Sequence, residues 1–391
     1  MRILHVCAIG ATAQGLLLPQ IDYFLARGLE VEIACSPDST VECLQNQGYL
    51  VYPVQINRKI SPILNLNSIL KLAQLMRQRR YDLVHVHTPI AAVLGRIAAK
   101  LAGIPRIVYT AHGFPFHDRS SPNQYRFYFT VEKLSALITN LILTQNREDV
   151  ETACNLRLCS PEKVKYLGNG IDMDRFRRDH LIADHQTQLR RALGIPDTAN
   201  LIIGTIGRLT RTKGSEYLID STAQLVSKFP NLHTLIIGYV SSGDPEPIEA
   251  KLIEKIHTLG LENNVTLTGQ RNDIRELLGL LDVFILPTFA HEGLPRSILE
   301  AMGMALPVVT TQIRGCREAV IHNETGVIVP PQDSQQLAKA LETLLSNDAL
   351  RQAYGKAGRQ RLEVEYDERL VFDRLASYYQ ELGIVFPTIQ I

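Results

Sequence analysis

The chain has 391 residues, a length that suggests two or three domains. Hydrophobic residues make up 45% and charged residues 21%, which is the balance of an ordinary globular protein. No apolar run approaches the roughly 18 residues that a membrane-crossing helix needs, and the net charge of +1 gives no reason to expect a nucleic acid partner. The six cysteines form no CxxC pair, so we expect reduced thiols in a cytoplasmic protein.

The first nine residues predict a β-strand and not a signal peptide. Arg2 is followed by an apolar run, as in a signal peptide, but the run is short, contains His5 and carries β-branched side chains. A second strand of the same kind, at 201–207, opens the other half of the chain. This similarity favours the strand.

Short apolar segments alternate with longer segments of helical spacing through the first half of the chain. Such alternation, with continuously apolar strands, predicts a buried parallel sheet that has helices on both faces. Strands are predicted at 2–8, 30–35, 50–53, 83–87, 106–110, 141–144 and 163–166, and helices at 17–27, 66–79, 89–103 and 125–138.

The second half repeats this plan, so the predicted fold class is α/β with two doubly wound, Rossmann-like domains. Its strands are predicted at 201–206, 233–238, 265–268, 282–286, 307–310 and 326–329. Domain ranges of 1–175 and 176–365 follow, with a linker near 176–198, and 366–391 is predicted as a helical tail that packs back on the first domain. Domains of this kind bind ligands at the carboxyl ends of their strands, so we expect a site in a central cleft between them.

A basic turn follows the first strand of the second domain. It runs from Gly207 to Gly214 and contains Arg208, Arg211 and Lys213. A strand-to-helix turn presents backbone N–H groups that favour phosphate, and fixed cations add to this. The spacing is not that of a P-loop. A basic exposed turn without function remains the alternative.

A second segment, at 291–302, begins His-Glu-Gly-Leu-Pro after a predicted strand. Pro295 suits the first position of a helix, so Glu292 lies just before that helix and Glu300 about one and a half turns into it. The free amides of Gly293 and Leu294 point at the same helix start. Carboxylates bind sugar or ribose hydroxyls while amides bind phosphate, although a capped helix with two surface acids would look the same.

Together these segments resemble a known family, the retaining bacterial glycosyltransferases of family 4, which have the two-domain GT-B fold. The resemblance covers essentially the whole chain, and the E-x7-E helix preceded by the Arg208/Lys213 turn is its most specific part. The segments at 110–114, 291–297 and 314–318 are typical of the subgroup that builds capsule, exopolysaccharide or lipid-linked glycans. The resemblance to the family is also carried by residues 81–89, 168–172, 307–310 and 325–330.

The resemblance implies a role for each site residue. Arg208 and Lys213 would hold the donor diphosphate, Glu300 the ribose hydroxyls and Glu292 the transferred sugar. His112 would lie beside the reacting carbon. The other nucleotide-sugar contacts would come from Gly10, Gly207, Gly238, Arg271, Gly293 and Leu294.

The mechanism that the resemblance implies is transfer with retention of the anomeric configuration and without a metal. The leaving phosphate and the incoming hydroxyl would share one face of the sugar, and cationic side chains would stabilise the developing charge. No cofactor is expected beyond the nucleotide-sugar co-substrate, most often UDP-linked in this family. The loop after the first strand lacks the usual adjacent glycines, which leaves the acceptor geometry open.

Two further motifs contain residue types that bind metals, and each has a simpler explanation. Asp172 and Asp174 form a D-x-D, but the cations of the turn already serve the phosphates. His85 and His87 share one face of a strand, but a third ligand is not evident, so polar packing is favoured over zinc.

The basic stretch at 58–80 predicts an anionic membrane surface as a partner. No acidic residue lies between Glu42 and Asp82, and apolar and basic residues alternate within that stretch. Capture of a phosphorylated acceptor and an ordinary solvated helix face are the alternatives. We therefore expect a cytoplasmic protein that lies on the inner face of the plasma membrane.

The sequence predicts an enzyme that transfers a sugar from a nucleotide-sugar to a glycan, a lipid-linked acceptor or a small molecule. A GT-B-type nucleotide-sugar 2-epimerase is the second hypothesis, since that class has the same two domains. A non-catalytic carbohydrate-binding homologue is the third. The presence of Arg208, Lys213, Glu292 and Glu300 favours the first.

Overall fold

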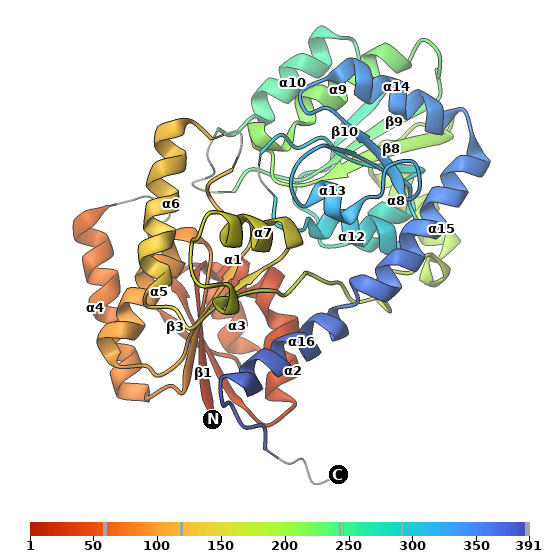
Figure 1. Cartoon of the computed structure of the whole chain (residues 1–391). Helices are drawn as coiled ribbons and strands as arrows, with labels where there is room; N and C mark the ends of the chain where they lie inside the picture. Colours follow the sequence, from red (N-terminus) through yellow and green to blue (C-terminus); the bar gives the residue numbers. More distant parts are fainter. Residues whose placement is uncertain (58–60, 118–119, 242–243, 245, 291, 388–391) are drawn as a thin grey trace. The chain divides into compact units, whose positions relative to one another are not determined.

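The computed structural model describes residues 1–57, 61–117, 120–241, 244, 246–290 and 292–387. They form two compact units, one of Met1–Gly168 with the chain from Val371 onward, the other of Asn169–Leu370. Each unit is built on a parallel sheet with helices on both faces (Figure 1). The predicted α/β class with two doubly wound domains is confirmed.

The sheet of the first unit has the strand order β3-β2-β1-β4-β5-β6-β7 within the described residues, and every pairing is parallel. Its direction of growth reverses at β1, which pairs with both β2 and β4. The strands are β1 (Arg2–Ile9), β2 (Glu30–Ser36), β3 (Leu50–Pro53), β4 (Leu83–His87), β5 (Ile107–Ala111), β6 (Leu141–Thr144) and β7 (Val164–Tyr166).

Helices cover both faces of this sheet because alternate strand residues point to opposite sides. Leu4 and Val6 of β1 belong to one core, and Ile3 and Cys7 to the other. The first core is covered by α4 (Pro62–Arg79), α5 (Pro89–Ala102), α6 (Pro122–Ala136) and α7 (Arg147–Asn155). The second is covered by α2 (Leu18–Leu25), α3 (Ser39–Asn46) and the part of α16 (Glu368–Glu381) from Val371 onward.

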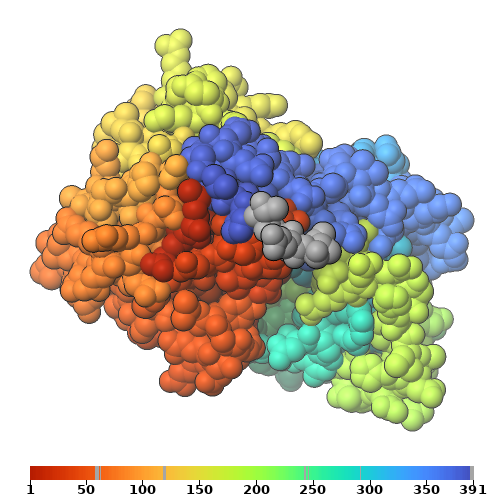
Figure 2. Space-filling model, turned by 90° about the horizontal axis from the view of Figure 1, so that it is seen from below, coloured from red at the N-terminus to blue at the C-terminus, as the bar shows by residue number. Residues whose placement is uncertain are grey.

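The C-terminal segment completes the second core of the first unit. Leu375 and Tyr379 of α16 are fully buried there, and the amide of Val385 lies 3.1 Å from the sulfur of Met1. Figure 2 shows this segment, in blue, against the red N-terminal region. From Val371 onward, the last helix therefore belongs to the first unit, although it lies near the C-terminus.

The second unit repeats the arrangement with the order β10-β9-β8-β11-β12-β13, again parallel throughout the described residues. Its strands are β8 (Leu201–Ile206), β9 (Leu232–Ile237), β10 (Val265–Leu267), β11 (Val283–Leu286), β12 (Val308–Thr311) and β13 (Gly326–Val329). One face is covered by α8 (Ala183–Ala192), α11 (Ile274–Gly279), α12 (Arg296–Gly303), α13 (Cys316–Ala319) and α15 (Asp348–Glu365), the other by α9 (Ser215–Leu225), α10 (Glu249–Thr258) and α14 (Ser334–Leu345).

The predicted linker at 176–198 contains the helix α8, which the sequence did not indicate. Leu189 is the only fully buried residue of α8. A helix with so few apolar side chains has no visible 3.6-residue period, which is why the sequence did not reveal it. None of the helices in the described part of the chain combines the length and apolar character that a bilayer crossing requires.

A buried ion pair joins α5 to α6. Arg96 Nη2 lies 2.9 Å from Glu132 Oε2, and the two side chains are 0% and 2% exposed. The guanidinium also stacks on the ring of Tyr109, with its central carbon 4.3 Å from the ring centroid. Since both charges are withdrawn from water, each depends on the other for its stability.

We predict that Glu132→Ala lowers the free energy of unfolding by about 3–5 kcal/mol, because it leaves the Arg96 charge buried and unpaired. Urea unfolding of the whole chain measures this. Glu381→Ala is the control in the same unit, because Glu381 pairs with Lys165 while 52% exposed and should change stability by at most about 1 kcal/mol. Equal losses in the two variants would contradict the prediction.

Candidate active site

The candidate site of the second unit lies where its strand order reverses. β8 and β11 are parallel neighbours, although the loops that follow them are far apart in the chain. One loop is the basic turn from Gly207 to Gly214, and the other leads from Pro287 to α12. Ligands of doubly wound sheets bind at such a reversal.

Lys213 and Glu292 meet between these two loops. Lys213 Nζ lies 2.6 Å from Glu292 Oε1, with the side chains 24% and 15% exposed. The hydroxyl of Thr288 lies 3.0 Å from the same carboxylate oxygen and 3.1 Å from the carbonyl oxygen of Thr212. The amide of Phe289 donates to that carbonyl as well. The ion pair is therefore held by a backbone connection between the loops.

Glycine at 214 is required by this connection. Gly214 has φ +76°, and a Cβ there would lie 2.0 Å from the carbonyl oxygen of Pro287. The close approach lets the short 3₁₀ turn at Arg211–Lys213 place Lys213 against the second loop. Sequence analysis named Lys213 but not Thr288, because a lone threonine after a strand carries no signal.

The guanidinium of Arg208 also forms an ion pair with a carboxylate. Its Nη1 atom forms an ion pair with Asp244 Oδ1, and its side chain is 47% exposed. Asp244 also accepts a hydrogen bond of 2.9 Å from the amide of Ser241. Arg208 and Lys213 thus both have carboxylate partners, of which Glu292 was named from sequence and Asp244 was not.

Gly207 and Gly238 form a close backbone contact at the ends of β8 and β9. A Cβ at Gly238 would lie 1.8 Å from the carbonyl oxygen of Gly207, so only glycine fits. Gly238 also bridges to Gly269, at the end of β10. Arg271 follows, in a two-bonded ion pair with Asp273. Gly207, Gly238 and Arg271, which the resemblance implied as nucleotide-sugar contacts, thus follow neighbouring strands of the sheet.

The loop before α12 is held from two sides. A Cβ at Gly315, where φ is +79°, would lie 2.0 Å from the carbonyl oxygen of Gly293. The buried Leu294 accepts a hydrogen bond of 2.9 Å from the side-chain amide of Asn169. Pro295 is the N-cap residue and α12 begins at Arg296, so the helix starts one residue later than the sequence suggested. His291 lies outside the described residues.

Glu300 is the fifth residue of α12, and its side chain is mostly buried. Its Oε1 atom is 3.9 Å from Arg296 Nε, one turn earlier, and its side chain is 17% exposed. Burial raises the pKa of Glu300 above its ordinary value, while the charge of Arg296 opposes this. Glu292 thus lies in the loop before α12, and Glu300 lies in the second turn of that helix.

In the first unit, Gly10 stands where the strand order reverses. Its amide donates a hydrogen bond of 3.0 Å to Asp38 Oδ2, and a Cβ there would lie 2.5 Å from Asp38 Oδ1. The glycine is therefore required by packing, and its N–H already has a partner. The loop after β4, the other neighbour of β1 in the sheet, begins at Thr88. The φ of Thr88 is +64°, which is a strained value for threonine.

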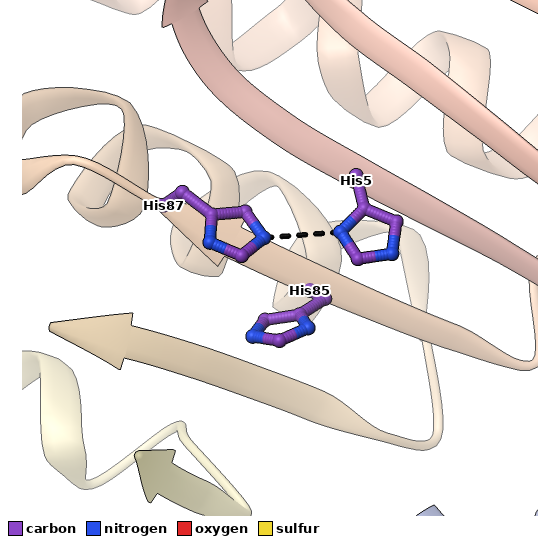
Figure 3. Close-up of side chains that lie close together, drawn as sticks. All are labelled: His5, His85 and His87. Carbon is purple, nitrogen blue, oxygen red and sulfur yellow. Dashed lines mark hydrogen bonds between the residues drawn. The ribbon is translucent and has the colours of Figure 1, made fainter. Parts of the chain in front are cut away.

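His112 follows β5 and belongs to a cluster of imidazoles. His112 Nε2 lies 3.3 Å from His87 Nδ1, and His87 Nε2 lies 3.0 Å from Nδ1 of His5 on β1. Figure 3 shows His5 and His87 joined, with His85 beside them. His5 is the third histidine that sequence analysis did not find, because strand pairing alone brings β1 next to β4.

The three buried histidines His5, His85 and His87 have nitrogen atoms close enough to share a metal ion. His85, however, has a hydrogen bond at each nitrogen, 2.7 Å to the hydroxyl of Tyr379 and 2.7 Å to that of Thr110. A metal would have to replace one of them. The arrangement therefore favours polar packing.

The D-x-D motif has a local structural role. Asp172 Oδ1 accepts hydrogen bonds from the amides of Asp174 and Arg175, at 2.9 and 3.0 Å. This is the way an aspartate closes a turn on its own backbone. One of its two carboxylates is thereby already engaged.

Two family models match the chain. "Glycosyl transferase 4-like" matches residues 5–146, and "Glycosyl transferases group 1" matches residues 185–361. The capsular polysaccharide biosynthesis glycosyltransferase CapM of Staphylococcus aureus is 26% identical over 97% of this chain and 96% of its own. An Escherichia coli UDP-Gal:alpha-D-GlcNAc-diphosphoundecaprenol alpha-1,3-galactosyltransferase is 29% identical over 75% of this chain and 74% of its own.

Among solved structures, Anabaena HepE in complex with UDP and glucose matches with a TM-score of 0.82 and 24% identity, covering 97% of this chain and 100% of that one. Fold and comparisons together define the class, which is that of the GT-B glycosyltransferases. The chain belongs to the group 1 glycosyltransferases, with relatives in the synthesis of capsular and lipid-linked glycans.

We predict that Gly315→Ala destabilises the second unit by more than a matched glycine substitution. Gly260 is the control, because its φ is +64° but a Cβ there would meet nothing within 4 Å. Gly260→Ala should cost about 1–2 kcal/mol for the left-handed backbone alone. Gly315→Ala must also displace the carbonyl of Gly293, so urea unfolding should show a larger loss. Equal losses would mean that the two loops are not tightly packed.

Proposed function

We propose that this glycosyltransferase takes its sugar from a nucleotide-sugar, and specifically from a UDP-sugar. Arg208 and Lys213 bind the diphosphate, Glu300 the ribose and Glu292 the sugar, with the base near Gly238 and Arg271. The pair of Lys213 with Glu292 at the strand reversal carries this proposal. The Escherichia coli relative is named for a UDP-sugar, and HepE was solved with UDP, which supports the choice of base.

Binding of the donor is an exchange of partners in this proposal. Lys213 is held by Glu292 and Arg208 by Asp244. A diphosphate offers these cations charge-assisted hydrogen bonds of the same kind, so it can replace the carboxylates. When Lys213 turns to phosphate, the carboxylate of Glu292 becomes free to accept a sugar hydroxyl. The carboxylates thus keep the cations in place until the donor arrives.

Transfer proceeds with retention and without a metal in this proposal. Arg208 and Lys213 stabilise the negative charge that grows on the leaving diphosphate. The acceptor hydroxyl enters on the face from which the diphosphate leaves, through a short-lived oxocarbenium-like ion pair, and its proton passes to the leaving diphosphate oxygen. His112 lies beside the reacting carbon, and Gly10 approaches the substrates. No carboxylate forms a covalent bond to the sugar, unlike in retaining glycosidases.

The acceptor is a growing glycan or a lipid-linked sugar, as in the synthesis of cell-surface polysaccharide. The name of the Escherichia coli relative specifies an acceptor linked to diphosphoundecaprenol. An acceptor on a lipid would bring the enzyme to the cytoplasmic face of the membrane.

We predict that UDP stabilises the wild-type protein against heat in the presence of EDTA, by about 2.7 kcal/mol at a UDP concentration of about 100 times Kd. Lys213→Ala should lose most of this stabilisation, because a phosphate contact is removed. Lys255→Ala is the control, since Lys255 also pairs with a carboxylate in the same unit, that of Asp220. GDP and ADP, tested in parallel, identify the base. A nucleotide that binds only with Mg²⁺ would refute the metal-free site.

Product analysis separates transfer from the epimerase alternative. We predict that free UDP accumulates only when an acceptor is added, and that the anomeric proton of the product keeps the coupling constant of the donor sugar. Conversion of the nucleotide-sugar into its 2-epimer without an acceptor would favour an epimerase. Nucleotide binding without any turnover would favour a carbohydrate-binding homologue.

We also propose that α4 places the enzyme on an anionic membrane. Ile63, Leu66 and Leu70 lie on successive turns of α4 and are 83%, 57% and 57% exposed. Lys71 and Arg77 are exposed further along the helix. An apolar stripe with adjacent cations suits the surface of an anionic bilayer. The first residues of the predicted stretch at 58–80, namely 58–60, lie outside the described residues.

Arg79 has another role than the one predicted for this basic stretch. It is ion-paired with Glu32, whose side chain is fully buried, and its guanidinium lies over the ring of Tyr52. A charge reversal at Arg79 would leave the Glu32 carboxylate buried without that partner. Membrane binding must therefore be tested elsewhere on α4.

We predict that the double variant Leu66→Asn, Leu70→Asn binds anionic vesicles at least about tenfold more weakly than the wild type, because each leucine buries apolar area in the lipid. Vesicle sedimentation measures this. The control is Ile253→Asn, because Ile253 is also 57% exposed but lies on α10 of the other unit. Unchanged binding of the double variant would remove α4 from the proposal.

A further inference from the structure

Both hydrogen bonds that the described residues donate to the carboxylate of Glu292 end on one of its two oxygens. Lys213 Nζ lies 2.6 Å from Oε1, and the hydroxyl oxygen of Thr288 lies 3.0 Å from the same atom. The side chain of Glu292 is 15% exposed. Its other oxygen, Oε2, thus accepts no hydrogen bond from the described part of the chain.

The two groups that hold Oε1 differ in charge, and so they respond differently to a phosphate. Lys213 is a cation, which a diphosphate can bind through charge-assisted hydrogen bonds as the carboxylate does. The hydroxyl of Thr288 is neutral, so a diphosphate has no comparable attraction for it. In the exchange of partners proposed above, Lys213 leaves the carboxylate of Glu292 and the hydroxyl of Thr288 remains. A glutamate side chain has several rotatable bonds, and without this hydroxyl its position would no longer be fixed.

Thr288 is itself held firmly by its neighbours. It is 0% exposed, and its carbonyl oxygen accepts a hydrogen bond from the hydroxyl of Thr311 on β12. The amide of the next residue, Phe289, donates a bond of 3.0 Å to the carbonyl oxygen of Thr212. A β-branched side chain also has few rotamers. The hydroxyl therefore cannot move far from the carboxylate of Glu292 unless the loop moves with it.

The hydroxyl of Thr288 has one hydrogen and two acceptors within reach. Its oxygen lies 3.0 Å from Glu292 Oε1 and 3.1 Å from the carbonyl oxygen of Thr212. That carbonyl already accepts the amide of Phe289, whereas the carboxylate carries a negative charge. A hydrogen bond to an ionised group is roughly twice as strong as one between neutral groups. The hydrogen therefore points to Glu292, and the more so once Lys213 has left.

We propose that Thr288 is a positioning residue that keeps the carboxylate of Glu292 in place when Lys213 turns to the donor diphosphate. The hydroxyl of Thr288 holds Oε1, and Oε2 accepts a hydroxyl of the transferred sugar. The sugar contact rests on the proposed function, but the hydrogen bond between Thr288 and Glu292 does not. Thr288 thus lets Lys213 bind the nucleotide part of the donor while Glu292 binds the sugar, although the two side chains form one ion pair.

Three variants separate the hydroxyl of Thr288 from its shape and from burial in general. Thr288→Val removes the hydroxyl and keeps the branched shape, whereas Thr288→Ser keeps the hydroxyl. Thr222→Val is the matched control in the same unit, because Thr222 on α9 is also 0% exposed. The hydroxyl oxygen of Thr222 lies 2.9 Å from the carbonyl oxygen of Leu218 and 2.9 Å from the hydroxyl oxygen of Thr234. Neither of these partners belongs to the candidate site.

The first test is a double-mutant cycle in urea unfolding of the full chain, and it needs no substrate. It compares the wild type, Thr288→Val, Glu292→Ala and the double variant. We expect the double variant to lose less stability than the sum of the single losses, because a shared hydrogen bond can be lost only once. The same cycle with Thr222→Val should be additive. Additive losses with Thr288→Val would mean that the hydroxyl serves the carbonyl of Thr212, and they would overturn the proposal.

The second test measures by calorimetry the Kd values of UDP, UDP-glucose and UDP-galactose. We expect Thr288→Val to change the Kd of UDP by less than about twofold, because the bond to Glu292 is present before and after UDP binds. The ratio of the Kd of the UDP-sugar to that of UDP should rise about tenfold, the effect of one lost hydrogen bond. Thr288→Ser and Thr222→Val should leave this ratio within about threefold of the wild type.

The outcomes separate this inference from the proposed function. Equal weakening of UDP and the UDP-sugar in Thr288→Val would mean that Thr288 only supports the packing of the loops. An equal rise of the ratio in Thr288→Ser would mean that the shape of the side chain matters and its hydroxyl does not. Either result, or an unchanged ratio in Thr288→Val, would overturn the positioning role. If the wild type binds none of these nucleotides, the proposed function fails, and the unfolding cycle still decides whether Thr288 holds Glu292.

Discussion

The parallel pairing of β8 with β11 is the constraint on which the candidate site depends. It brings Lys213 to Glu292 across 79 positions of the chain and lets the two following loops share hydrogen bonds. The sheet reverses its order at this pair, which is where doubly wound sheets bind their ligands. Glycines at 214 and 315 then let the backbones come closer than any other residue would allow.

The paired charges of this unit have a consequence for binding. Lys213, Arg208 and Arg271 each have a carboxylate partner. Partly exposed ion pairs contribute little stability, so exchanging one for a diphosphate costs little. At the same time the pairs hold long, flexible side chains near the positions where phosphate would need them. The site is thus ordered before its ligand arrives.

The first unit buries polar side chains within its sheet. His5, His85 and His87 lie in the core, where burial keeps their rings neutral. Neutral imidazoles can satisfy one another because each offers one donor and one acceptor.

The sequence by itself determined the strands and the fold class, since continuously apolar segments between helical ones form a buried parallel sheet. It also located Lys213, Glu292 and Glu300, because their spacing resembles that of a known family. It could not reveal the helix α8, whose apolar residues are too few, or the partners Asp244, Thr288 and His5. These partners are decided by tertiary structure alone, because pairing of distant strands and loops brings together residues whose types and spacing carry no signal along the chain.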